Sequence, residues 1–273
     1  MQEATALHSV FAANRSAGRI ALTVAAEAGV TRRRQVYEDG PLRIRFPNGA
    51  PPGLEAMIVN TAGGIAGGDR HELDIGVMGG AALTVTTAAA EKIYRALGPD
   101  AEIAVKLAAG AEARLSWLPQ ETILFDRARL KRSIEVDLAP GATLLMAEAV
   151  IFGRSAMGEA VEEGALTDRW RVRRDGQLMF AETVRLDGAI ARMLREPAVA
   201  RGGIAIATVL AVPADQAMAD CVRAQTFCGE VGVSAWNGLA VARLCAKDGE
   251  DLRRDLVAVI AALGGALPRL WLN

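Results

Sequence analysis

The sequence is poor in the residues that most often carry catalysis. Its 273 residues include two histidines, three cysteines and 4% aromatic residues. So few histidines give little support to a Ser-His-Asp arrangement, and no G-x-S-x-G segment is present. Cys221 and Cys228 are not at a zinc-binding spacing, and we expect Cys221 to be buried on the apolar side of a helix. Cysteines confined to one end favour a reducing compartment over a disulfide framework.

Net charge and long apolar runs are also lacking. The 31 Lys and Arg residues are balanced by 32 Asp and Glu residues, whereas a nucleic-acid-binding protein would be expected to carry an excess of basic residues. The first residues do not resemble a secretion signal, and no apolar run is long enough to span a bilayer. We therefore expect a cytoplasmic protein without nucleic-acid or membrane partners.

Alternation of apolar and polar residues dominates the chain from Gly18 to Val212, which is typical of β-strands. Asp175-Gly176 and Asn237-Gly238 each separate two such segments and favour two-residue hairpin turns. The apolar run from Gly202 to Val212 is typical of a strand buried on both faces. The predicted strands cover residues 19–26, 31–37, 42–46, 54–60, 70–77, 81–87, 101–107, 111–117, 121–125, 130–138, 143–152, 166–174, 177–185, 202–212, 231–236 and 239–245.

Two helices are predicted near the C-terminus. The first covers residues 214–227, directly after Pro213, and the second is capped by Asp248 and ended by Gly264-Gly265. Together these patterns predict a mainly β fold.

The predicted architecture is a large body of stacked or helical β-sheet over residues 18–212, approximately, followed by a helix–hairpin–helix piece over about 213–273. The length fits one large β domain or two ordinary domains. Because no linker separates the two parts, residues 1–273 are predicted to form a single domain.

A doubled glycine pair follows one predicted strand, with Gly63, Gly64, Gly67 and Gly68 directly before Asp69. A phosphate-binding loop is one interpretation of such a segment. However, it lacks both the G-x-G-x-x-G spacing and a following Lys-Ser/Thr pair, and an alternating strand follows it in place of a helix. The stretch is therefore predicted to be a tight bend between two strands.

Two carboxylates interrupt apolar strands, namely Glu148 and Glu182. Burying a carboxylate is costly unless it is paired or hydrogen-bonded. Either these side chains lie on the outward faces of their strands and stay hydrated, or they line an internal polar cavity or path. The sequence leaves both possibilities open.

Other charged residues are predicted to lie at the surface. His71 stands among polar strand residues, where a histidine is generally solvated, although a metal role shared with Asp69 is the alternative. The other histidine, His8, lies in the N-terminal stretch. Lys131 and Arg132 are expected to be exposed, because charged side chains prefer water.

Five segments, in this order, resemble the urease accessory protein D family (UreD, also called UreH) over nearly the whole chain. They are GGIAGGD at 63–69, TTAAAEKIYR at 86–95, LPQETILF at 118–125, GRSAMGE at 153–159 and PRLW at 268–271. Gly63, Gly64, Gly67, Gly68, Pro119, Gln120, Glu121, Gly153 and Arg154 are the motif residues for which a structural role is expected. Ala62 and Ala88 depart from the family pattern, which often has Pro and Gln there.

The resemblance implies a mainly β fold and a non-enzymatic function in urease maturation. Members act as chaperones or scaffolds that bind the urease apoenzyme with accessory protein F and the GTPase accessory protein G, and they assist nickel insertion. No tightly bound cofactor is implied. Nickel would pass transiently along an internal path, and Asp69, Glu148 and Glu182 are the carboxylates expected to contact it. Oxygen ligands suit such exchangeable binding, since imidazole and thiolate hold nickel more tightly.

A carboxylate-dependent hydrolase on a β scaffold and a generic β binding module are the alternatives. A hydrolase would need an open concave site with two facing carboxylates. A scaffold would instead present broad apolar or mixed surfaces to its partners.

Overall fold

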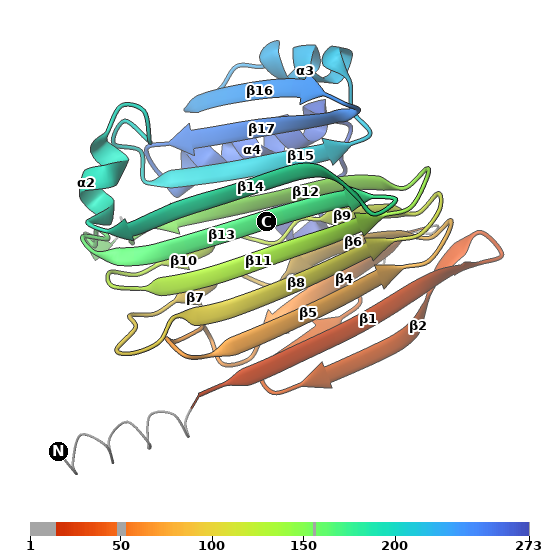
Figure 1. Cartoon of the computed structure of the whole chain (residues 1–273), viewed down its shortest axis with the longest axis horizontal. Coiled ribbons are helices and arrows are strands. Elements are labelled where there is room, and N and C mark those ends of the chain that lie inside the picture. Colours follow the sequence, from red (N-terminus) through yellow and green to blue (C-terminus); the bar gives the residue numbers. More distant parts are fainter. Residues whose placement is uncertain (1–14, 48–52, 155–156, 273) are drawn as a thin grey trace.

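Two β-sheets lie face to face and form the body of the protein (Figure 1). The computed structural model describes residues 15–47, 53–154 and 157–272. One sheet has seven strands and the other has ten. The mainly β, stacked-sheet fold predicted from the sequence is therefore confirmed. His8, Ser155 and Ala156 lie outside the described residues.

Each sheet has a defined strand order. The seven-stranded sheet runs β14 (Gln177–Gly188), β13 (Gly164–Arg174), β11 (Arg129–Leu138), β8 (Ala101–Ala109), β5 (Arg70–Val77), β1 (Ala17–Glu27) and β2 (Val30–Asp39). The ten-stranded sheet runs β16 (Glu230–Trp236), β17 (Leu239–Ala246), β15 (Ala205–Val212), β12 (Thr143–Phe152), β9 (Arg114–Trp117), β6 (Ala82–Thr87), β4 (Leu54–Asn60) and β3 (Leu42–Arg45), with β10 (Thr122–Leu124) beside β12 and β7 (Glu91–Ile93) beside β10.

The chain winds between the two sheets from β4 to β13. It places β5, β8, β11 and β13 side by side and parallel in the seven-stranded sheet. Between these strands it adds β6, β9 and β12 in parallel to the ten-stranded sheet. Each turn of the chain thus adds a strand to both sheets, as in a β-solenoid.

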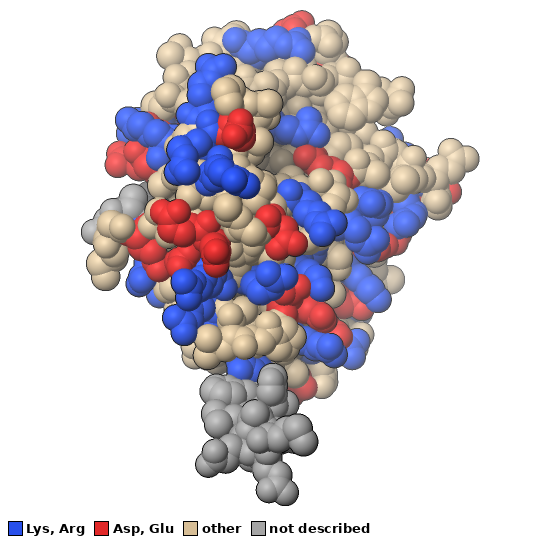
Figure 2. Space-filling model, turned by 60° about the vertical axis from the view of Figure 1, so that its left-hand side comes forward, with Lys and Arg blue, Asp and Glu red and all other residues tan. Residues whose placement is uncertain are grey.

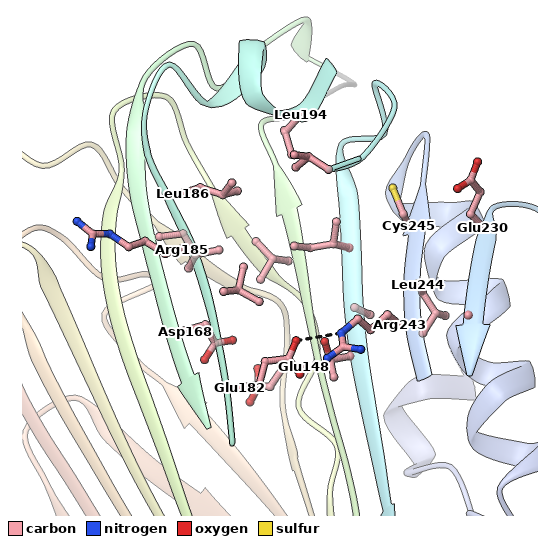
Figure 3. A pocket seen from close by; sticks show the side chains of 18 of the residues that line it. Glu148, Asp168, Glu182, Arg185, Leu186, Leu194, Glu230, Arg243, Leu244 and Cys245 are labelled. Carbon is pink, nitrogen blue, oxygen red and sulfur yellow. Dashed lines mark hydrogen bonds and ion pairs between the residues drawn. The ribbon is translucent and has the colours of Figure 1, made fainter. Parts of the chain in front are cut away.

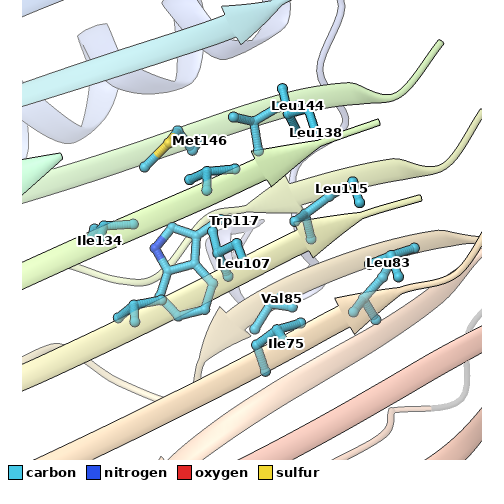
Figure 4. Close-up of a cluster of buried hydrophobic side chains, with 14 of the residues drawn as sticks. Ile75, Leu83, Val85, Leu107, Leu115, Trp117, Ile134, Leu138, Leu144 and Met146 are labelled. Carbon is cyan, nitrogen blue, oxygen red and sulfur yellow. The ribbon is translucent and has the colours of Figure 1, made fainter. Parts of the chain in front are cut away.

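Stacked rows of apolar side chains fill the space between the sheets (Figure 4). Leu107 stands in register with Ile75 on one side and Val136 on the other. Trp117 stands in register with Val85 and Met146 on the facing sheet. Inward and outward residues alternate along each strand, so apolar residues at every second position build this core.

Helices cover the outer face of the ten-stranded sheet at its C-terminal end. They are α3 (Gln216–Arg223) and α4 (Gly249–Ala262), and α2 (Ile190–Arg195) and the 3₁₀ turn η2 (Arg269–Leu272) complete the described helical elements. The apolar side of α4 packs on β15 and β17. The Asp248 side chain accepts from the backbone N–H of Asp251 and caps α4, as predicted. No helix of the described ranges combines the length and apolar character needed to cross a bilayer.

Residues 202–212 were predicted to form a strand that is buried on both faces. The packing of α4 on β15 accounts for the burial of its outer face. In β15 the residues from Val209 to Val212 are all buried, because the inner face meets the other sheet and the outer face meets α4. The hairpin of β16 and β17 continues the ten-stranded sheet beside β15.

The first C-terminal helix is shorter than predicted. It covers Gln216–Arg223, because Asp215 is extended and caps it, and its buried residues are Ala219 and Val222. Cys221 is exposed, so the prediction that it is buried was wrong. The sequence patterns also missed β7 and α2.

Both predicted hairpin turns are present. Positive φ angles occur at Asp175 and Gly176 (51° and 75°) and at Asn237 and Gly238 (48° and 76°). The doubled glycine pair is a bend that leads directly into β5, with positive φ at Gly63, Gly64 and Gly68. The prediction of a structural bend without a following helix is confirmed.

Candidate functional site

A cavity of about 680 Å³ lies where the two sheets separate, between β13 and β14 on one side and β12, β15, β16 and β17 on the other. Figure 3 shows Glu148, Asp168 and Glu182 gathered at one end of it, near Arg243, with Leu186 and Leu194 toward the other end. The cavity therefore has a carboxylate-rich end and an apolar end.

Glu148 faces the cavity because of the alternation along β12. Leu144, Met146, Glu148 and Val150 share the inner face of the strand, and Leu145 and Ala147 on its outer face belong to the cluster that packs against α4. Neither face is open to water, and Glu148 is 5% exposed. Of the two possibilities left open by the sequence, the hydrated one is wrong for Glu148.

Arg132 pairs with two carboxylates inside the protein. It stands beside Asp168 in the register of β11 and β13, and its Nε and Nη2 donate to the two Asp168 oxygens at 3.1 and 2.5 Å. Its Nη1 donates to Glu148 Oε2 and, at 3.2 Å, to the Thr122 hydroxyl. We call Arg132, Glu148 and Asp168 the buried triad. Arg132 was predicted to be exposed with Lys131, but only Lys131 is.

Two tryptophans complete the hydrogen bonding of the triad. The Trp117 Nε1 donates to Glu148 Oε1 at 2.7 Å, and the Trp170 Nε1 donates to Asp168 Oδ1 at 3.1 Å. Every carboxylate oxygen of the triad thus has at least one donor, which buried charges require.

Electrostatics set the protonation of the triad. Burial raises the pKa of Glu148 to about 7, and the Asp168 charge adds to that rise while Arg132 opposes it. Burial acts to lower the pKa of Arg132, yet the two carboxylates hold that pKa above its usual value. Arg132 is therefore a fixed positive charge.

Glu182 projects into the cavity from β14, where it pairs in register with Trp170. Its Oε1 accepts from Arg243 Nε at 3.1 Å, and its Oε2 is buried without a hydrogen-bond partner among the described residues. Its side chain is 14% exposed, so this carboxylate is also not on a hydrated outer face.

Three polar side chains cross the ten-stranded sheet in one row. Glu148 on β12 pairs with Thr208 on β15, which pairs with Arg243 on β17. Residues paired in register lie on the same face of a sheet, so all three face the cavity. We call Glu148, Thr208 and Arg243 the polar row; it leads from a buried carboxylate to an exposed guanidinium.

Asp69 does not line the cavity. Its Oδ1 accepts from the backbone N–H of Ser16 and its Oδ2 from that of Ala66, both at 2.8 Å. The structure thus brings together Glu148 and Glu182, and it places Asp69 at the glycine-rich bend before β5.

His71 is 4% exposed, so the expectation that it is solvated was wrong. Its Nε2 is without a hydrogen-bond partner in the described part of the chain. Burial lowers the pKa of His71, and the nearby Asp69 opposes that effect. Over residues 15–47, 53–154 and 157–272, no group of three or more His, Cys, Asp and Glu side chains is arranged to hold a metal ion.

The LPQE motif connects the β9–β10 loop to the C-terminal end of the chain. Arg253 Nη1 donates to Gln120 and Glu121 side-chain oxygens, both at 2.7 Å, and Pro119 is buried beside them. The Arg253 guanidinium lies 5.0 Å from the ring centroid of Trp271. These motif residues therefore hold η2 against the loop.

The GRSAMGE motif also makes local contacts. Gly153 has a φ of +92°, and the Arg154 Nε donates to Glu159 Oε2 at 2.6 Å. The Arg154 guanidinium lies 4.2 Å from the ring centroid of Phe125. Both residues stabilise the segment that follows β12.

Glu148 and Glu182 were predicted from the sequence as site residues, whereas Arg132, Asp168 and Arg243 were not. Strand alternation carried a usable signal for Arg132, because it stands between Leu130 and Ile134 on the apolar face of β11. No such signal marks Arg243, whose position depends on which strands become neighbours.

Comparison with known proteins identifies the relatives of this chain. A family model described as "UreD urease accessory protein" matches residues 16–272. A protein named "Urease accessory protein UreD" from Rhodopseudomonas palustris (strain BisA53) is 57% identical over 97% of this chain and 93% of its own length. Another with the same name, from Bradyrhizobium diazoefficiens, is 55% identical over 99% of both chains.

These relatives carry the name of an accessory protein and not of an enzyme, in agreement with the non-enzymatic role predicted from the sequence. The match extends over both sheets, the cavity and the C-terminal helices. The chain belongs to the UreD family of urease accessory proteins.

Proposed function

We propose that the protein acts in the cytoplasm as a maturation factor for urease. In this role it binds the urease apoenzyme together with the urease accessory proteins F and G and assists nickel insertion. Membership of the UreD family supports urease as the target. On the face seen in Figure 2, basic and acidic side chains are interspersed, which suits protein partners of mixed charge.

The proposed role in nickel transfer rests on the cavity. Glu148, Asp168 and Glu182 meet at one end of it. Nickel is the cargo here, and carboxylate oxygens bind it less tightly than imidazole or thiolate groups do. A series of carboxylates in a partly buried cavity therefore supports passage of the ion and its release.

Asp69 is a second proposed contact for nickel, predicted from the family resemblance and not from the cavity. Its two oxygens each accept one backbone hydrogen bond at the bend before β5. No tightly bound cofactor forms part of the proposal.

A hydrolase would use two free carboxylates facing each other across a substrate. Glu148 and Asp168 are both bound to Arg132 instead. This pairing favours a structural and electrostatic role for them over acid–base catalysis.

The test is activation of urease in cells that co-express the urease subunits and all accessory proteins. We expect Glu148→Gln and Glu182→Gln to lower urease activity about tenfold, because each removes a charge that attracts nickel while keeping the side-chain shape. The matched control is Glu135→Gln, which changes a glutamate on the outer face of β11 that pairs with Arg169 and Arg173.

Association with partners is measured in the same cells by pull-down of the tagged chain. We expect urease and accessory proteins F and G to be recovered with every variant. Full urease activity in both cavity variants, with the complexes intact, would exclude the nickel-transfer role. Failure of the unaltered chain to associate with urease would exclude the maturation role itself. Asp69→Asn tests the second proposed contact separately.

A further inference from the structure

Arg243 and Glu182 form an ion pair across the carboxylate-rich end of the cavity. Arg243 belongs to β17 of the ten-stranded sheet and Glu182 to β14 of the seven-stranded sheet, so the pair joins the two sheets (Figure 3). The Nε–Oε1 distance is 3.1 Å. The second oxygen, Glu182 Oε2, is buried and has no hydrogen-bond partner in the described ranges.

The two arginines near the carboxylates differ in their freedom to move. Arg132 is 4% exposed and donates to Asp168, Glu148 and Thr122, so its guanidinium is held in place. The Arg243 side chain is 61% exposed. A long arginine side chain at the surface can turn its head group into water, and the cost of leaving the largely buried Glu182 is offset when another cation takes its place.

The charges at this end of the cavity suit a divalent cation once Arg243 has left. With the ion pair closed, the carboxyl groups of Glu148, Asp168 and Glu182 face two guanidinium groups. With Arg243 turned into water they face Arg132 alone, so the carboxyl groups outnumber the positive charges and a cation is favoured beside Glu182. The polar row then offers oxygens of Glu148 and Thr208 beside the freed Glu182 carboxylate.

We propose that Arg243 is a gate residue that occupies the cation position against Glu182 until a divalent metal ion displaces its guanidinium into water. The inference rests on the proposed role of the cavity in nickel transfer and assigns to that cavity the residue that controls entry. Without the gate, the largely buried Glu182 carboxyl group would have no cation beside it whenever the cavity was empty, which burial makes costly.

The test is equilibrium dialysis of the purified full-length chain against Ni²⁺, with five variants. We expect Arg243→Gln to bind Ni²⁺ about tenfold more tightly than the unaltered chain, because a competing positive charge beside Glu182 is gone. Arg243→Lys keeps the charge and is expected to bind within about twofold of the unaltered chain. The matched control, Arg169→Gln, removes an exposed arginine that pairs with Glu135 at 2.9 Å on the outer sheet face, and little change is expected.

Two further variants test whether Arg243 acts through Glu182. In the double variant Glu182→Gln, Arg243→Gln, the gain in affinity over Glu182→Gln alone should disappear, since the cation position no longer exists. The proposal is overturned if Arg243→Gln binds Ni²⁺ no more tightly than Arg169→Gln, if no variant binds Ni²⁺, or if the gain persists in the double variant.

The two proposals can fail separately. Normal urease activation by Glu148→Gln and Glu182→Gln would reject the transfer role, whatever the dialysis shows. Reduced activation by these variants, together with unchanged Ni²⁺ binding by Arg243→Gln, would reject only the gate.

Discussion

The charged residues inside this protein were only partly predictable. Glu148 stands out in the sequence because it interrupts a long apolar run, and its burial is one of the two arrangements that the sequence allows. Arg132 was wrongly predicted to be exposed together with Lys131, because charged side chains generally prefer water. In a strand, however, neighbouring residues point to opposite faces, so one of the two had to point inward. The presence of Asp168 beside Arg132 could not be predicted, because it depends on the pairing of β11 with β13.

Replacing Arg132 tests the energetics of the buried triad. Arg132→Leu would leave Glu148 and Asp168 buried without their counter-charge, so we expect the free energy of unfolding to fall by about 3–5 kcal/mol. Urea denaturation followed by circular dichroism measures this change. The control is Lys131→Leu, whose side chain is 62% exposed. An Arg132→Leu variant as stable as the control would show that the triad contributes nothing to folding.

Glu91 is a second carboxylate in an unusual setting. Asn60 Nδ2 donates to both of its oxygens at 3.1 Å, and also to the Gly64 carbonyl, so the side chain lies against the glycine-rich bend. Burial raises the pKa of Glu91 to about 7, although the Asn60 hydrogen bond opposes that rise. The folded protein therefore keeps a proton on Glu91 at pH values where the unfolded chain has released it.

The pH dependence of stability follows from this raised pKa. Between about pH 4.5 and 7 the folded state binds more protons at Glu91 than the unfolded state, so stability falls as pH rises through this window. Glu91→Gln removes the effect. We therefore expect the free energy of unfolding of the variant, relative to that of the unaltered protein, to rise by about 1–3 kcal/mol when the pH is raised from 5 to 8. Urea denaturation at the two pH values measures the gain, and an equal difference at both would contradict the prediction.

At the scale of elements, strands were far more predictable than helices. β4, β5 and β12 have the predicted ends, because period-two alternation is sharp and turn residues bound these strands. β7 has only three residues, too few to show a period. The end of α3 was misplaced because the chain after Arg223 turns back: Asp255 of α4 accepts from the backbone N–H groups of Cys228 and Gly229 at 2.8 and 2.7 Å.

The glycine-rich bend is held against β7 by specific contacts. The backbone N–H of Ile65 donates to the Lys92 carbonyl, and the Tyr94 hydroxyl donates to the Gly63 carbonyl. A side chain at Gly64 would collide with the Tyr94 ring and the Lys92 carbonyl, whereas one at Gly63 would meet open space. Both glycines have positive φ.

These two glycines form a matched pair for mutation. We expect Gly63→Ala to cost about 1 kcal/mol of stability, from backbone strain alone. Gly64→Ala should cost about 2 kcal/mol more, because the bend must move away from β7. Thermal unfolding of both variants measures the difference. Equal melting temperatures would mean that the contact with β7 does not restrain the bend.

For the molecule as a whole, the sequence predicted the class of the fold but not its topology. Alternating strands and two C-terminal helices were correctly expected, since they depend on local patterns. The strand order was not predictable, because the parallel pairing of β5, β8, β11 and β13 joins segments far apart in the chain. The cavity depends on that order, and so does the meeting of Glu182 with Arg243.

The spacing of the residues in the polar row sets the distance over which an ion would move in each step through the cavity. Its three residues sit on adjacent hydrogen-bonded strands, and such strands are about 4.8 Å apart. The spacing of the strands therefore sets the step length, and an ion that followed the row would advance by one strand spacing at a time. A step of this length allows an ion to touch the Thr208 hydroxyl before it leaves the Glu148 carboxyl group, so it need not regain its full shell of water between them.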